Sequence, residues 1–238
     1  DFLKEIQNSN VKPIEPVFLD FKKDLSQLKA KSGIPVLYKQ NTSNDLFQLI
    51  YVFDMGNNND KALGTAFDYI DYLGTSDMTP EQVKSEFYRL ACNFRVSPGN
   101  ERTYVVLSGL NENMPEAMKL FEKLMADAQV NKEAYTNMVA DILKSRKDAK
   151  LNQMQNFRRL MNYGMYGPKS PATNILTETE LQTMDPQELT DRIHNQNSYK
   201  HRIMYYGPTS EKELLAIINK NHQAPKKLKE IPVGNEFP

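Results

Sequence analysis

Short apolar runs separated by turn-forming residues dominate the first third of the chain. Three such runs lie at residues 17–21, 25–30 and 34–38. This pattern predicts short strands joined by turns. The run at 46–55 is longer and almost continuously apolar. It predicts a central strand that is covered on at least one face.

Helical periodicity follows this long strand. Residues 60–73 are expected to form a first helix, with Asp60 as its N-cap and Gly74 as its stop. Four apolar residues have the spacing of a buried helical stripe: Leu63, Ala66, Phe67 and Ile70. One face of the first helix is therefore expected to pack in the core.

A second helix and a hairpin come next. Thr79 fits the N-cap position of this helix, and Pro80 fits its first turn. Its apolar side is expected to comprise Val83, Phe87, Leu90 and Ala91. The turn-forming residues 98–101 then separate two strand-like segments, 93–97 and 103–110, as in a β-hairpin.

The remainder of the chain is mainly helical. Five helices, one strand and a final helix are predicted, in this order, at residues 114–128, 131–152, 153–163, 177–184, 185–195, 202–206 and 210–221. Strands are clustered and do not alternate regularly with helices, so the predicted class is α+β, an antiparallel or mixed sheet with helices packed on one side. We expect an N-terminal linker at 1–14, a single domain at 15–224 and a C-terminal linker at 225–238.

Charge and composition disfavour several classes of function. Lys and Arg number 30, Asp and Glu also number 30, and the formal net charge is zero. No overall field would steer the chain to nucleic acid or to anionic lipid, so no nucleic-acid partner is expected. No run approaches the roughly 18 apolar residues needed to span a bilayer, which predicts a soluble protein without a membrane span. The chain begins with Asp1 and carries no signal peptide, which indicates a fragment or a processed form.

The candidate reactive residues form no recognisable catalytic set. No two of the histidines His194, His201 and His222 have the i, i+3 or i, i+4 spacing of helical metal ligands. His201 is expected at the surface, and His194 beside carbonyls at a helix end. The single cysteine, Cys92, is expected to be a small buried core residue, and Ser108 lacks a nucleophile elbow. We therefore predict no catalytic, cofactor-binding or metal-binding residue in this chain.

Three further groups have a structural and a functional interpretation. Asp68 and Asp71 could act as paired carboxylates, but they are expected on the solvated side of their helix. Tyrosines beside Gly-Pro turns at 163–168 and 205–208 could contact an extended peptide, or could close the ends of a helix and a strand. The basic segment 144–150 is interpreted as a solvated helix face.

Five segments carry a resemblance to a known family: residues 54–56, 66–75, 79–81, 103–109 and 199–208. In this order they resemble one homologous domain of the insulinase and pitrilysin family of zinc peptidases. Active members carry the pattern H-x-x-E-H, in which the two His bind zinc and the Glu polarises the bound water. Here Phe67 and Asp71 occupy the His positions, and Ile70 occupies the Glu position. The resemblance is strongest to the inactive domains of large bacterial members.

The resemblance implies repeated α+β domains around a closed chamber in which unfolded peptides are cut. This chain would be an internal domain, the third of four, that builds the chamber wall and an interdomain scaffold. Asp141 and Asp148 lie roughly where the family's distant Glu ligand would lie, but without the two His neither is assigned as a ligand. No cofactor is expected in the chain itself, and another domain would supply zinc.

Two interpretations of function follow. The first is a non-catalytic domain of a multidomain zinc metalloendopeptidase, whose partners are the other domains of the same polypeptide and an unfolded peptide substrate. The alternative is a non-enzymatic binding or structural module derived from the peptidase fold. The resemblance places the protein in the bacterial cytoplasm or periplasm, without a choice between the two.

Overall fold

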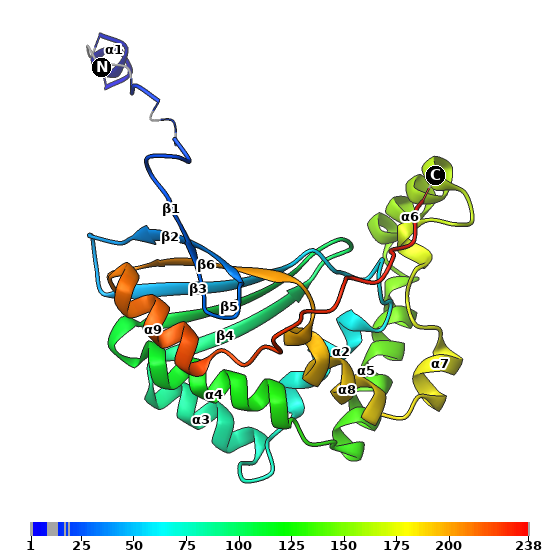
Figure 1. The fold of residues 1–238 in the computed structure, drawn as a ribbon. Helices are drawn as coiled ribbons and strands as arrows, with labels where there is room; N and C mark the ends of the chain where they lie inside the picture. Colours follow the sequence, from blue (N-terminus) through cyan, green and yellow to red (C-terminus); the bar gives the residue numbers. More distant parts are fainter. Residues whose placement is uncertain (1, 9–13, 17, 19, 238) are drawn as a thin grey trace.

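The computed structural model describes residues 2–8, 14–16, 18 and 20–237. A short helix, α1 (Phe2–Asn8), lies well away from the sheet (Figure 1). The strand predicted at 17–21 falls partly outside the described residues. Its described end is a turn, because the amide of Lys23 donates to the carbonyl of Asp20 at 2.9 Å.

The described residues form one six-stranded sheet in the order β1-β2-β6-β3-β5-β4. Its strands are β1 (Ser26–Lys29), β2 (Pro35–Gln40), β3 (Leu46–Phe53), β4 (Cys92–Pro98), β5 (Thr103–Leu110) and β6 (His201–Gly207). Within the described part, β2 and β6 pair in parallel and the other neighbours are antiparallel. The sheet is therefore mixed, as predicted. The long apolar strand β3 lies inside it between β5 and β6, which also confirms its predicted central position.

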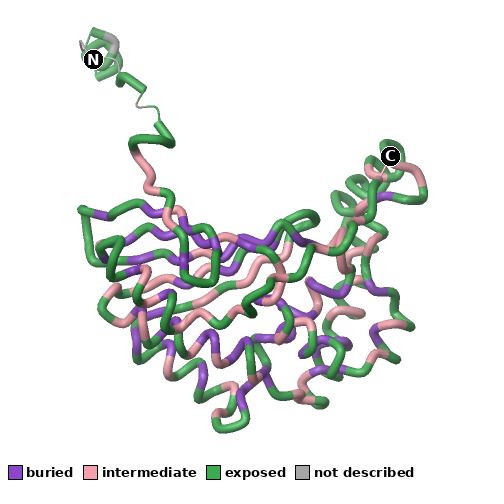
Figure 2. The backbone as a smooth tube through the Cα atoms, viewed as in Figure 1, coloured by how far each residue is buried: buried purple, intermediate pink, exposed green. Residues whose placement is uncertain are grey.

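Helices cover one face of this sheet, which confirms the α+β class. The elements after β3 are α2 (Leu63–Tyr69), η1 (Ile70–Tyr72), α3 (Pro80–Arg89), η2 (Asn111–Asn113), α4 (Met114–Asp127), α5 (Lys132–Ala149), α6 (Gln153–Tyr166), η3 (Pro171–Thr173), α7 (Glu178–Thr183), α8 (Gln187–Asn195), η4 (Gln196–Ser198) and α9 (Glu211–Asn221). Figure 1 shows α3, α4 and α9 lying across one face, with α2, α5, α7 and α8 grouped beside them and α6 at the periphery. Figure 2 shows buried residues concentrated between the sheet and these helices.

Two helix boundaries differ from the prediction. Asp60 does not cap a helix: its Oδ1 accepts from the amide of Ala62 at 3.0 Å in a preceding turn, so α2 begins only at Leu63. At the end of α3, Ala91 has a φ of +47°, a left-handed conformation that stops the helix and leaves this residue exposed. The predicted N-terminus of α3 is confirmed, because Thr79 and Gln82 form a capping box.

The C-terminal segment is hydrogen-bonded to the domain. The amide of Lys229 donates to the carbonyl of Ser198 at 2.7 Å. The amide of Asn235 donates to the carbonyl of Asn58 at 2.7 Å. The side chain of Asn59 also donates to the carbonyl of Pro232 at 2.8 Å. Residues 225–237 therefore run along the domain surface (Figure 1), and the linker at 225–238 stays a prediction.

Candidate functional site

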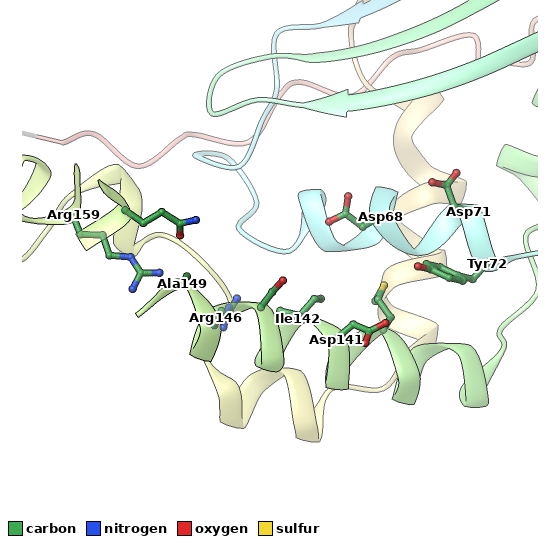
Figure 3. A pocket seen from close by; sticks show the side chains of 11 residues that line it. Asp68, Asp71, Tyr72, Asp141, Ile142, Arg146, Ala149 and Arg159 are labelled. Carbon is green, nitrogen blue, oxygen red and sulfur yellow. The ribbon is translucent and has the colours of Figure 1, made fainter. Parts of the chain in front are cut away.

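A cleft of about 580 Å³ lies between α2, α5 and α6 and includes Asp71, one of the three positions of the family pattern (Figure 3). Its lining residues come from these elements and from η1: Asp68, Asp71, Tyr72, Met138, Asp141, Ile142, Ser145, Arg146, Ala149, Gln155 and Arg159. The cleft therefore combines carboxylates from the α2 side with arginines from α5 and α6. Figure 3 shows the carboxylates of Asp68 and Asp71 at one end and Arg159 at the other.

Two of the three positions that carry H-x-x-E-H in active family members, Phe67 in α2 and Ile70 in η1, face away from this cleft. Phe67 is 3% exposed and Ile70 is 2% exposed, and both belong to the hydrophobic core. The residues that reach the cleft are Asp68, Asp71 and Tyr72. The predicted stripe of Leu63, Ala66, Phe67 and Ile70 is thus confirmed as buried.

The carboxylates of the cleft are held in a partly desolvated environment. Burial raises the pKa of Asp68, and the neighbouring charge of Asp71 raises it further. Burial also raises the pKa of Asp71, while Lys84 opposes this change. Both residues are nevertheless exposed, which agrees with the prediction that they lie on the solvated side of the helix.

The residues of this cleft do not fit a zinc site. Among the described residues, no three or more His, Cys, Asp and Glu side chains are grouped so that they could hold a metal ion. Asp141 reaches the cleft from α5, whereas Asp148, the other candidate for the distant ligand, is not among the lining residues. Phe67 and Ile70 have no donor atom for a metal, so no catalytic step can be assigned through one.

A second polar group is buried between α4, α9 and the sheet. The side chains of Glu122 and His222 are 2% and 1% exposed, and Glu122 Oε1 lies 2.6 Å from His222 Nδ1. Tyr51 also donates to Oε1 at 2.9 Å. Oε2 accepts from the side chain of Asn197 at 3.0 Å and from the amide of Gln223 at 3.2 Å. The carboxylate of Glu122 is therefore fully hydrogen-bonded inside the protein.

His201 extends this group to the strand β6. Its Nε2 lies 2.9 Å from His222 Nε2, and its Nδ1 lies 2.7 Å from the carbonyl of Tyr199. A carbonyl can only accept, so His201 Nδ1 carries a proton; its neutral ring then accepts at Nε2, and His222 donates from Nε2. His222 Nδ1 is in turn within hydrogen-bonding distance of Glu122 Oε1, at 2.6 Å. We call Glu122, His201 and His222 the buried triad.

The prediction that His201 lies at the surface is wrong. It is 7% exposed, and burial lowers its pKa to about 4, with a smaller contribution from His222. His222, its side-chain partner, is 21 residues away, so spacing along the chain could not reveal the contact. One signal was available: Glu122 has helical spacing to Met118 and Met125, both buried on α4, and it therefore had to face the core.

The other predicted residues have structural roles. Cys92 is buried, its thiol lies 3.9 Å from the carbonyl of Leu110, and burial raises its pKa. Ser108 donates to the side chain of Asn93 at 3.1 Å. His194 Nε2 lies 3.0 Å from the carbonyl of Ala128, the C-cap residue of α4, so the predicted contact with a helix-end carbonyl is present but involves a different helix.

The two tyrosine clusters differ from each other. Tyr205 is buried, stacks on Tyr38 with ring centroids 5.7 Å apart, and donates to Asn111 at 2.9 Å. These contacts support the structural interpretation for Tyr205. Tyr163, in contrast, is 60% exposed and lines a second, larger cleft beside α5. Tyr206, next to Tyr205, is 44% exposed, so each cluster has one tyrosine that is accessible to a partner.

Comparison with known proteins identifies the fold. No family model and no curated relative matches this sequence. Solved structures do: the periplasmic protease PqqL from Escherichia coli has a TM-score of 0.78 at 14% identity over 98% of this chain and 29% of its own. The peptidase M16 inactive domain from Pseudomonas fluorescens has a TM-score of 0.72 at 16% identity over 90% of this chain and 54% of its own.

A third similar structure is the ferredoxin protease FusC, solved as a mutant in complex with Arabidopsis ferredoxin. Its TM-score is 0.71 at 11% identity, over 94% of this chain and 27% of its own. This chain thus spans between about a quarter and about half of the similar proteins. Within the described residues, no helix is long and apolar enough to cross a membrane. The chain has the fold of a domain of the M16 peptidases, the insulinase and pitrilysin family.

Proposed function

We propose that this chain is a non-catalytic domain of a multidomain zinc metalloendopeptidase, in which it forms part of the chamber wall and an interdomain scaffold. One observation carries the proposal. On a fold shared with M16 domains, the helix that would present H-x-x-E-H instead packs Phe67 and Ile70 in the core. Neither residue can bind a metal or transfer a proton, so zinc would come from another domain of the parent protein.

The outer surface of α6 supports the scaffold role. Its residues include no buried side chain. Besides Tyr163, five large apolar residues on this helix are exposed: Met154, Phe157, Leu160, Met161 and Met165. We call them the α6 stripe. An exposed apolar surface of this kind is typical of a site covered by a partner. We propose that another domain of the parent covers it, since the similar proteins are about two to four times longer than this chain.

The partners and the compartment follow from the same proposal. The chamber would hold an unfolded peptide substrate, and no nucleic acid is needed. Both the cytoplasm and the periplasm of a bacterium would suit such a protein. The similarity to PqqL, a periplasmic protease, favours the periplasm.

Zinc content and peptide cleavage test the proposal directly. The purified 238-residue chain should contain less than stoichiometric zinc by atomic absorption after dialysis, and it should leave a quenched fluorescent peptide intact. Stoichiometric zinc together with cleavage would refute the proposal. The alternative, a non-enzymatic module, is favoured if the full reading frame carries no H-x-x-E-H segment.

A further inference from the structure

A cleft of about 1090 Å³ lies beside the C-terminal half of α5. It is bordered by α5, α6 and the segment 170–178. We call it the basic cleft, because five cationic side chains line it: Lys144, Arg146, Lys147, Lys150 and Arg159. Glu178 is the only carboxylate among its lining residues.

These cations have no ion-pair partners in the described part of the chain. None of the five belongs to a salt bridge there, although other lysines and arginines do, for example Lys61 and Arg192. The chain as a whole has a net charge of zero, so the positive charge of the cleft is a local concentration. A cleft with this imbalance attracts anionic groups from solution.

The arrangement of the lysines gives the cleft a direction. Lys144 and Lys147 lie on α5, and Lys150 is its C-cap residue; the three follow one another at i, i+3 spacing along one side of the end of this helix. At 1.5 Å per residue they extend over about 9 Å, which matches about three residues of an extended peptide. Like charges at neighbouring positions of a helix repel each other, and a bound anion would reduce this repulsion.

The cleft also offers apolar and positioned groups. Leu143, Tyr163 and Ile175 line it together with the cations. Arg146 donates from Nη1 to the carbonyl of Leu176 at 2.7 Å, which holds this guanidinium in place. Arg146 and Arg159 also line the 580 Å³ cleft, so the two clefts adjoin. A ligand here would meet cations and apolar side chains together, which suits a polypeptide better than a bare phosphate backbone.

We propose that the basic cleft binds an acidic segment of an extended polypeptide, with its carboxylates among Lys144, Lys147 and Lys150 and its apolar side chains against Leu143 and Ile175. This inference rests on the proposed function, because it defines which substrate segments this domain would hold. Several charged pairs in an open cleft give modest affinity that depends on salt. Binding of this kind holds a peptide reversibly.

Fluorescence anisotropy with labelled peptides tests the inference on the 238-residue chain. The probe is a short peptide of alternating Glu and Leu, compared with peptides of equal length in which Gln or Lys replaces Glu. The Glu peptide should bind at least about tenfold more tightly than either, and its affinity should fall at least about threefold when salt rises from about 0.05 M to about 0.5 M. Equal binding of the Glu and Gln peptides would overturn the inference.

A matched pair of variants locates the site. The double variant Lys147→Glu, Lys150→Glu should bind the Glu peptide at least about tenfold more weakly. The control, Lys39→Glu with Lys119→Glu, makes the same charge change outside the cleft and should change the affinity less than about twofold. All four lysines are exposed, so the thermal midpoint should not change. Lys147→Gln with Lys150→Gln gives a second test without added negative charge. Equal losses in the two charge-reversal variants would overturn the inference.

Two further outcomes are informative. A poly-uridine RNA that binds more tightly than the Glu peptide, and that loses affinity in the same variants, would assign the cleft to nucleic acid and overturn the inference. If the chain proves to hold zinc and to cleave peptides, the proposed function fails, while the loss of Glu-peptide affinity in the cleft variants can still be measured. The two failures can therefore be distinguished.

Discussion

Glu122 Oε1 and His222 Nδ1 lie 2.6 Å apart at a place where both side chains are almost fully buried. A buried pair of this kind does not by itself stabilise a fold, because desolvation opposes the attraction between the partners. Here the remaining hydrogen-bonding positions are also filled: Tyr51, Asn197 and the amide of Gln223 all donate to the same carboxylate. The pair therefore joins α4 and α9 to β3 under the sheet, and its removal leaves several donors without a partner.

Glu122→Gln should destabilise the protein by about 3–5 kcal/mol, as expected when one partner of a buried pair is removed. Four donors already point at this carboxylate. The Gln side chain replaces one acceptor oxygen with an NH₂ group, so at least one of the four donors loses its acceptor. Urea unfolding at neutral pH measures the change. The matched control is Glu116→Gln on the exposed side of the same helix, which should change stability by less than about 0.5 kcal/mol. Equal effects of the two substitutions would contradict the hydrogen-bond assignment.

His201 gives the protein a predicted pH dependence. Burial lowers its pKa to about 4 in the folded state, whereas the unfolded value is near 6.5. Between these values the unfolded chain binds a proton that the folded chain does not, so stability falls as pH falls from about 6.5 to about 4. The contribution is on the order of 3 kcal/mol and is fully present above about pH 6.5.

Urea unfolding at a series of pH values measures this dependence. Carboxyl groups also titrate between about pH 4 and about 6.5. The test is therefore the difference between the wild type and His201→Asn in how the free energy of unfolding depends on pH. The variant should be less stable at neutral pH, but it should lose less stability on acidification. Parallel curves for the two proteins would show that His201 is not the titrating group.

Much of the fold follows from local sequence signals. The capping box at Thr79, the apolar stripe of α2 and the hairpin between β4 and β5 all depend on residues close together in the chain. Such signals specify where helices and strands lie. They do not specify which strands pair, and the parallel contact of β2 with β6 joins segments that lie far apart in the sequence.

The buried triad marks the limit of this reasoning. His222 lies 21 residues from His201 and 100 from Glu122, so only the folded chain brings them together. A histidine at the start of a short strand has a polar sequence neighbourhood, and this led to the wrong surface assignment of His201. The basic segment 144–150 was different: its exposure is consistent with the prediction, but the cleft beside it is formed by α6 and by residues 170–178. Local pattern cannot reveal a cleft made by three segments.

Phe67→Ala should cost about 3–5 kcal/mol, the usual range when a large aromatic side chain is removed from a core. Phe67 is 3% exposed and occupies the first ligand position of the family pattern, so this substitution tests whether the position is structural. Thermal or urea unfolding gives the value. Asp68→Ala, at the next position on the cleft side, serves as the control and should change stability by less than about 0.5 kcal/mol. A negligible effect of Phe67→Ala would mean that α2 presents a different face to the core.

Substitutions in the α6 stripe should weaken association with another domain without changing the stability of this chain. Phe157 and Met161 are 56% and 49% exposed. Phe157→Asp with Met161→Asp should therefore change the stability of this chain by less than about 0.5 kcal/mol. The same pair should weaken its association with the separately expressed remainder of the parent protein at least about tenfold, since apolar residues at the centre of an interface contribute most of its binding energy.

Sedimentation velocity of the mixed components measures that association, and Asn162→Asp provides a control with a charge on another side of the same helix. If the Asp pair and the control associate equally well, another surface of the domain makes the contact. If the Asp pair unfolds the chain, α6 is part of the core in solution and its apolar residues need no partner. Loss of association with unchanged stability is the result expected if another domain of the parent protein covers the apolar surface of α6.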